Sequence, residues 1–148
     1  MGDNPAPAEV DSLRAARPRP LITPESAPFW QSAREHGLKL PMCTSCSRYF
    51  FPPAGFCPRC WNDSVVWASV EGTGIIVTYV TFHRLYDPSF ADLLPYSTAV
   101  IELDEGPRLL GRISGSLDPS VGARVSIVYE DLDDETTVLL FEVTGATL

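Results

Sequence analysis

Four cysteines within residues 43–60 are the side chains of this 148-residue sequence whose type and spacing best support chemistry. They form two pairs, Cys43 with Cys46 and Cys57 with Cys60, and two residues separate the members of each pair. A gap of two residues lets both thiolates of a tight turn face one point, and two such turns supply the four sulfur ligands of a tetrahedral zinc site. The spacing therefore predicts Zn²⁺ bound by Cys43, Cys46, Cys57 and Cys60.

Sulfur at all four positions leaves no ligand site for water or substrate, so we expect this zinc to be structural. Three alternatives use the same cysteines: iron bound as in rubredoxin, two disulfides, or a redox-active cysteine pair. We favour zinc because a reducing cytosol disfavours disulfides and because a redox pair needs no second copy.

The sequence has two histidines, His36 and His83, and neither belongs to a motif of zinc proteases, serine hydrolases or nucleotide-binding loops. We expect His36 to cap a helix C-terminus and His83 to lie on the surface at the end of a strand. With the cysteines assigned to the metal, the remaining nucleophiles are serines and threonines without an evident histidine and carboxylate. The chain is therefore not expected to be an enzyme by itself.

The formal net charge of −8 is unevenly distributed along the chain. Residues 1–60 carry seven basic and five acidic side chains, whereas residues 61–148 carry four basic and fourteen acidic ones. An acidic surface repels phosphates, which argues against nucleic-acid binding. No apolar run approaches the roughly 20 residues of a membrane span, and the first ten residues lack signal-peptide features, so we expect a cytoplasmic protein without a membrane partner.

The elements that must position the cysteines differ between the two halves. Ten of the fourteen prolines lie in residues 1–60, and residues 1–21 have the composition of a linker or flexible tail without a helical core. Hydroxyl and acidic residues at 23–26 and a glycine at position 37 bracket a short predicted helix at 27–36. Around the cysteines we expect the short strands of a zinc ribbon, at residues 37–42, 47–52 and 64–68.

The second half has the pattern of a small β-domain. Runs rich in β-branched and aromatic residues predict strands at 65–70, 74–82, 97–103, 108–113, 124–130 and 137–143. The last five of these strands, without an intervening helix, favour a small antiparallel barrel or sandwich. The acidic residues between 130 and 135 are predicted to form a solvated turn, and the connection over 84–95 is a long loop with exposed apolar side chains.

Several motifs together resemble those of the DUF35 family. They are Thr23–Trp30, the run from Gly37 to Cys46, Pro52-Pro53, Cys57-Pro-Arg-Cys60, Pro95-Tyr96 and the run from Glu102 to Leu109. The resemblance covers about residues 22–145. It implies a mainly β protein with a short N-terminal helix, a rubredoxin-like zinc ribbon and a five-stranded antiparallel OB-fold barrel. The implied domains are 1–21 (linker or tail), 22–66 (helix and zinc ribbon) and 67–148 (barrel). Ser47 and Trp61 depart from the pattern, because zinc knuckles often carry glycine there.

The family resemblance also implies a role. Such proteins are accessory subunits of thiolase-superfamily enzymes, including the thiolase-like aldolases that cleave steroid side chains as CoA thioesters, and two accessory chains would join two enzyme chains. Some are fused behind a MaoC-type hydratase domain, for which residues 1–21 would be the linker. The alternatives are a subunit of a biosynthetic or degradative thiolase and a free acyl-CoA binding protein.

Two sets of contacts are predicted on this basis. The aromatic residues expected to contact a protein partner are Phe29, Trp30, Tyr86, Phe90 and Tyr96. The basic residues expected to contact CoA phosphates are Lys39, Arg48 and Arg59.

Overall fold

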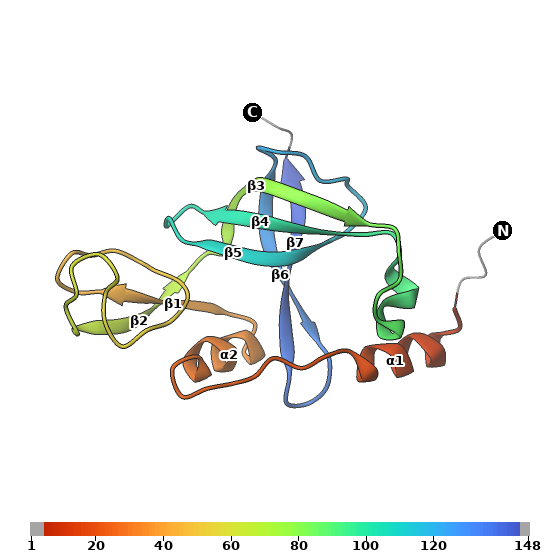
Figure 1. Cartoon of the computed structure of the whole chain (residues 1–148), viewed down its shortest axis with the longest axis horizontal. Coiled ribbons are helices and arrows are strands. Elements are labelled where there is room, and N and C mark those ends of the chain that lie inside the picture. Colours follow the sequence, from red (N-terminus) through yellow and green to blue (C-terminus); the bar gives the residue numbers. More distant parts are fainter. Residues whose placement is uncertain (1–4, 146–148) are drawn as a thin grey trace.

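The fold is described from a computed structural model in which residues 5–145 are placed. In chain order the elements are α1 (Pro7–Ala16), α2 (Ala27–Arg34), β1 (Leu38–Cys43), β2 (Val65–Val70), β3 (Thr73–Phe82), the 3₁₀ helix η1 (Pro88–Leu93), β4 (Tyr96–Leu103), β5 (Arg108–Ser114), β6 (Arg124–Asp131) and β7 (Thr137–Gly145). The structure is mainly β, as the sequence predicts, with a two-stranded ribbon beside a five-stranded barrel (Figure 1).

The barrel is closed in the order β3-β4-β5-β7-β6. Four neighbouring pairs are antiparallel, but β5 and β7 run parallel, with Arg112 opposite Leu140 and Ser114 opposite Glu142. The expectation of a purely antiparallel barrel is therefore wrong. Geometry requires this correction, because strand directions cannot alternate around a closed ring with an odd number of strands.

The zinc ribbon consists of β1 paired with β2, from Leu38 opposite Val70 to Cys43 opposite Val65. The strand predicted at 47–52 is reduced to a single bridge between Met42 and Tyr49. Prolines at positions 52 and 53 have no N–H to continue a ladder, which explains the short pairing. β2 crosses the boundary between the predicted domains 22–66 and 67–148, so this division remains a prediction.

One hydrophobic core joins the ribbon to the barrel. Phe29 of α2 and Leu38 and Leu40 of β1 are buried in the same cluster as the barrel interior. The barrel contributes Ile76, Ala99, Ile101, Leu103, Leu109, Ala123, Val125, Phe141 and Val143. Helix α2 lies between the ribbon and the lower end of the barrel (Figure 1). The shared core fixes the position of the metal-binding end relative to the barrel.

The N-terminal segment contains a helix that the sequence analysis did not predict. Residues 7–16 form α1, although residues 1–21 were expected to be a linker or flexible tail. Pro7 stands in the first turn, where a missing N–H is tolerated, and the prolines at 18 and 20 follow the helix instead of interrupting it. α1 lies beside η1, which forms within the loop expected at 84–95 (Figure 1).

Helix α2 ends two residues earlier than predicted, and His36 follows it with a φ of 54°. The N–H groups of His36 and Gly37 donate to the carbonyls of Ala33 and Ser32, which closes the helix C-terminus. Among residues 5–145, no helix is long and apolar enough to cross a membrane.

Candidate metal centre and partner surface

The four cysteine thiols converge on one point at the end of the ribbon. All four sulfur atoms lie within 4.8 Å of one another, and the Cys43–Cys60 and Cys46–Cys57 sulfur distances are 3.6 Å and 3.7 Å. A tetrahedron with zinc–sulfur bonds of about 2.3 Å has sulfur–sulfur edges of about 3.8 Å. The predicted ligands therefore fit one structural Zn²⁺, and a full set of four sulfurs gives the metal no catalytic ligand position.

The surroundings of two of the cysteines shift the pKa values of their thiols in opposite directions. N–H groups of Cys60 and Arg59 lower the pKa of Cys57 to about 7. Desolvation raises the pKa of Cys46 to about 11, and a cation bound by the four sulfurs would favour the thiolate form.

Ser47 and Trp61, which replace the usual knuckle glycines, both have positive φ, at 59° and 63°. The sequence therefore keeps the left-handed turn after each cysteine pair, although neither residue is glycine.

The five predicted partner contacts fall into two groups. Phe29 is only 4% exposed and packs in the core, with its ring edge-on to Trp30 at 5.0 Å, so it offers little surface to a partner. The other three lie at the η1 end of the barrel, where Tyr96 stacks on Phe90 at 5.6 Å and Tyr86, 72% exposed, reaches furthest into solvent. Phe82, which the sequence analysis did not select, stacks on Tyr96 at 5.1 Å. We call Phe82, Tyr86, Phe90 and Tyr96 the aromatic cluster.

The three basic residues predicted to contact CoA phosphates are exposed on the ribbon. Lys39 lies on β1, Arg48 follows the first knuckle, and Arg59 lies within the second. They share a module with the metal centre, and their contact with a ligand remains a prediction.

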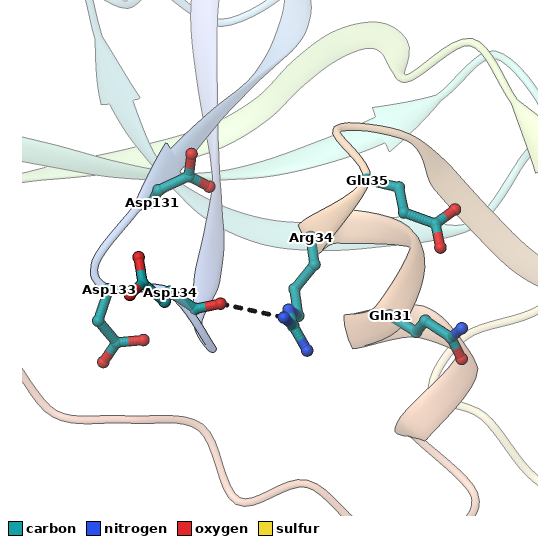
Figure 2. A pocket seen from close by; sticks show the side chains of 6 residues that line it. All are labelled: Gln31, Arg34, Glu35, Asp131, Asp133 and Asp134. Carbon is teal, nitrogen blue, oxygen red and sulfur yellow. Dashed lines mark hydrogen bonds between the residues drawn. The ribbon is translucent and has the colours of Figure 1, made fainter.

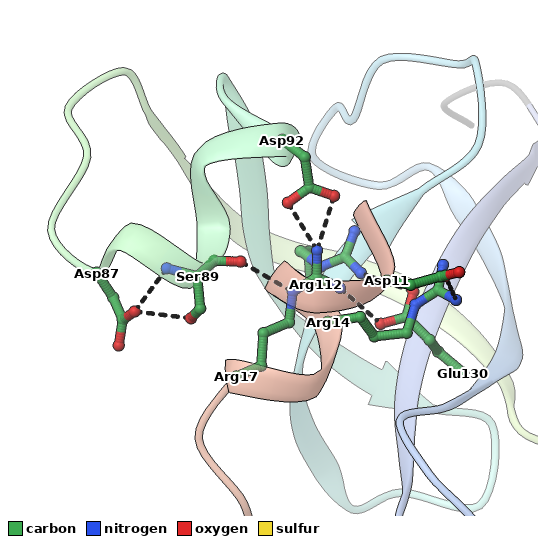
Figure 3. A network of polar contacts seen from close by, with 8 residues as sticks. All are labelled: Asp11, Arg14, Arg17, Asp87, Ser89, Asp92, Arg112 and Glu130. Atoms are coloured by element: carbon green, nitrogen blue, oxygen red, sulfur yellow. Dashed lines mark hydrogen bonds and ion pairs between the residues drawn. The ribbon is translucent and has the colours of Figure 1, made fainter. Parts of the chain in front are cut away.

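A buried ion network was missed by the sequence analysis (Figure 3). The Arg17 guanidinium donates to both carboxylate oxygens of Asp92 at 2.8 and 2.9 Å, to Glu130 at 3.1 Å and to the Ser89 carbonyl at 3.3 Å. Arg112 donates to the other oxygen of Glu130 at 3.4 Å. Arg17 and Asp92 are 75 residues apart, so no local pattern could reveal the pair. The network ties the end of α1 to η1 and β6.

The acidic turn after β6 faces α2 across a cavity of about 660 Å³ (Figure 2). Arg34 donates to the Asp134 carbonyl at 3.0 Å, and His36 Nε2 lies 3.0 Å from Asp131. Hydrogen bonds from Thr137, and next from His36, lower the pKa of Asp131. The turn was predicted to be solvated, and the carboxylates of Asp131, Asp133, Asp134 and Glu135 are exposed. The prediction is wrong for Glu130, which lies in β6 and pairs with Arg17 and Arg112 in the partly buried ion network.

Family models match both modules of this chain. The ChsH2 rubredoxin-like zinc ribbon domain matches residues 30–66, and the ChsH2 C-terminal OB-fold domain matches residues 67–130.

Among curated proteins, the chain is 32% identical over 99 residues to a "DUF35 domain-containing scaffold protein" of Methanocaldococcus jannaschii, covering 62% of this chain and 70% of the relative. It is 32% identical to a "Probable enoyl-CoA hydratase alpha subunit" of Thermomonospora curvata, over 86% of this chain and 40% of the relative. It is 30% identical to the "3-oxo-4,17-pregnadiene-20-carboxyl-CoA hydratase alpha subunit" of Mycobacterium tuberculosis, over 78% of this chain and 37% of the relative. The chain thus spans about two fifths of these hydratase subunits.

Among solved structures, the chain is similar to one from the "Ltp2-ChsH2(DUF35) aldolase", with a TM-score of 0.76 and 28% identity. The match covers 84% of this chain and 98% of the other.

Proposed function

This chain belongs to the DUF35 family, and from that membership we propose that it is a non-catalytic accessory subunit that binds a thiolase-superfamily enzyme and supports its acyl-CoA site. The observation that carries the proposal is the similarity to a chain of an aldolase with a DUF35 component, which extends over nearly the whole of that chain. The similarity includes both the ribbon and the barrel. It therefore favours the interpretation that the two chains assemble with a partner in the same way, and not merely that both contain a metal-binding module.

The side chains of this protein support an accessory role. Within residues 5–145, the histidine–carboxylate contact that the structure contains joins His36 to Asp131, and both side chains are about half exposed. The hydroxyl beside this pair, that of Thr137, donates to the carboxylate and not to the imidazole. Because the hydroxyl does not donate to the imidazole, these three side chains cannot activate a serine- or threonine-type nucleophile. The proposal therefore assigns the bond-making and bond-breaking groups to the partner.

For the partner, we favour an enzyme that cleaves the side chain of a steroid CoA thioester by a retro-aldol reaction. The steroid name of one relative and the aldolase name of the similar structure support this choice. The proposed assembly contains two enzyme and two accessory chains. The longer hydratase-named relatives support a MaoC-type hydratase domain fused ahead of the ribbon. Accessory subunits of other thiolases and free acyl-CoA binding proteins are the alternatives.

The proposed contact surface combines Trp30 with Tyr86, the exposed member of the aromatic cluster. Aromatic side chains dominate the binding energy of many protein interfaces, and Tyr86 is the most exposed aromatic side chain of this cluster. The basic side chains of Lys39, Arg48 and Arg59 are proposed to meet the CoA phosphates in the complex.

Co-expression of this chain with a thiolase-like steroid side-chain aldolase tests the proposal. We expect both chains to elute together in size-exclusion chromatography, and Tyr86→Glu to weaken the complex. Val121→Glu is the matched control, because Val121 is also exposed but lies in the loop between β5 and β6. Separate elution of the two wild-type chains, together with tight acyl-CoA binding by this chain alone in calorimetry, would favour the free acyl-CoA binding alternative.

A further inference from the structure

A second cavity lies on the outer face of the barrel. It has a volume of about 400 Å³ and is lined by residues of β3, β4, β5, β6, β7, η1 and the segment after α1. Its lining is mostly apolar and includes Phe82, Phe90, Leu110, Leu139 and Leu140. A mainly apolar cavity of this size with a few polar groups has the usual character of a small-molecule site. We call it the β5–β7 pocket.

The pocket exists because two strands separate. β5 and β7 pair only from Arg112 to Ser114 and from Leu140 to Glu142. The earlier residues of both strands have no such pairing, and their apolar side chains line the gap between them. Leu110 is 72% exposed and also lines a neighbouring cavity of about 250 Å³ beside Trp30, so the pocket is open at this side chain.

Arg112 has unused hydrogen-bond donors in this pocket. Its side chain is 15% exposed and lines both the β5–β7 pocket and the adjacent cavity of about 350 Å³. Among the residues that the structure describes, its guanidinium makes one hydrogen bond, the 3.4 Å contact with Glu130. A guanidinium has five N–H donors, and Arg17 in the same network makes four hydrogen bonds. Arg112 can therefore donate to a further acceptor.

The charges show what kind of acceptor fits. Two guanidinium groups, Arg17 and Arg112, face two carboxylates, Asp92 and Glu130, so these four ion-paired groups are together formally neutral (Figure 3). A carboxylate or phosphate added here would leave one negative charge in excess in a partly buried site, which is costly. A neutral carbonyl oxygen would accept from Arg112 without changing the charge balance.

We propose that the β5–β7 pocket binds a neutral molecule that has a hydrocarbon body and a carbonyl group of the amide or ester class, with the carbonyl oxygen accepting a hydrogen bond from Arg112. The hydrocarbon lies against Phe82, Leu110 and Leu140. Desolvation lowers the pKa of Arg112, in agreement with limited access of water to this guanidinium. This binding belongs to the chain itself and does not depend on the partner enzyme of the proposed function.

Titration of the zinc-loaded chain with three probes of similar length, followed by backbone amide NMR, tests the pocket. The probes are N-hexylacetamide, octanoate and octylammonium, which differ in the charge of the polar end. We expect N-hexylacetamide to bind with a millimolar dissociation constant, as its size allows, and to shift the signals of Thr98, Leu110, Arg112 and Leu140. The two charged probes should bind more weakly at these residues.

Two variants separate binding from folding. Arg112→Met removes the donor and should weaken N-hexylacetamide binding roughly fivefold to tenfold. Leu110→Glu puts a charge at the exposed mouth, where little stability depends on the side chain, and should also abolish the shifts. Val121→Glu should bind like the wild type. Equal binding of octanoate, unchanged binding by both pocket variants, or no shifts at the pocket up to the solubility limit of N-hexylacetamide would overturn the proposal.

Discussion

Replacing Phe29 by alanine should destabilise the whole protein, although the sequence analysis placed this residue among the partner contacts. The ring is 4% exposed and contacts two other aromatic rings, with centroid distances of 5.0 Å to Trp30 and 5.2 Å to Phe51. Truncation of a buried phenylalanine costs about 3–5 kcal/mol, and each lost aromatic pair accounts for about 1 kcal/mol of such a cost. We expect a loss of about 4 kcal/mol in the free energy of unfolding.

Urea denaturation of the zinc-loaded chain, followed by tryptophan fluorescence and by far-ultraviolet circular dichroism, measures this loss. Because Phe29, Leu38 and Leu40 share one core with the barrel, both probes should report a single transition in wild type and variant. Tyr86→Ala is the matched control: its ring is 72% exposed, and its loss should be below about 0.5 kcal/mol.

The reasoning is refuted if Phe29→Ala costs less than about 1 kcal/mol. It is also refuted if the barrel signal keeps its wild-type midpoint while the ribbon alone unfolds. Either result would mean that α2 belongs to the ribbon surface and does not join the two modules.

Three further predictions concern the metal and the ion pairs. Chelation of zinc should increase amide hydrogen exchange first at residues 43–64, while β3 to β7 stay protected. The reason is that the cysteine loops have few buried apolar side chains of their own. Simultaneous exchange throughout the chain would contradict this prediction. Arg17→Met leaves the buried Asp92 without its partner and should lower the free energy of unfolding, measured by urea denaturation, by about 3 kcal/mol. The same substitution in an Asp92→Asn background should cost clearly less. Equal costs in both backgrounds would argue against coupling of the two side chains. Hydrogen bonds from Arg124 and Thr73 lower the pKa of Asp104. The difference in unfolding free energy between wild type and Asp104→Asn should therefore be constant above about pH 4 and shrink as the pH falls below it. A difference that grows on acidification would contradict the lowered pKa of Asp104.

Much of the β-structure could be predicted because its signals are local. Alternating apolar residues between turn residues place β2 and the five barrel strands within two residues of their observed bounds. The cysteine spacing likewise predicts the cluster of four sulfurs, because each pair lies in one tight turn. The parallel contact of β5 with β7 follows from barrel closure, which pairs residues far apart in the chain.

The missed features depend on tertiary contacts. α1 has no buried residue, and its position depends on Arg17, whose partners lie in η1 and β6. Phe29 and Trp30 are adjacent aromatic residues in the sequence, and only packing against the barrel makes the first a core residue. The β5–β7 pocket has no sequence signal, because it results from the divergence of two strands.

This chain is proposed to act through a thiolase-like enzyme. The most direct measurement is the rate at which that enzyme cleaves a steroid side-chain CoA thioester, with and without this chain at equal concentration. We expect little cleavage by either chain alone and full activity of the co-purified complex, with equal numbers of the two chains by light scattering. An enzyme that is fully active alone and does not bind this chain would contradict it.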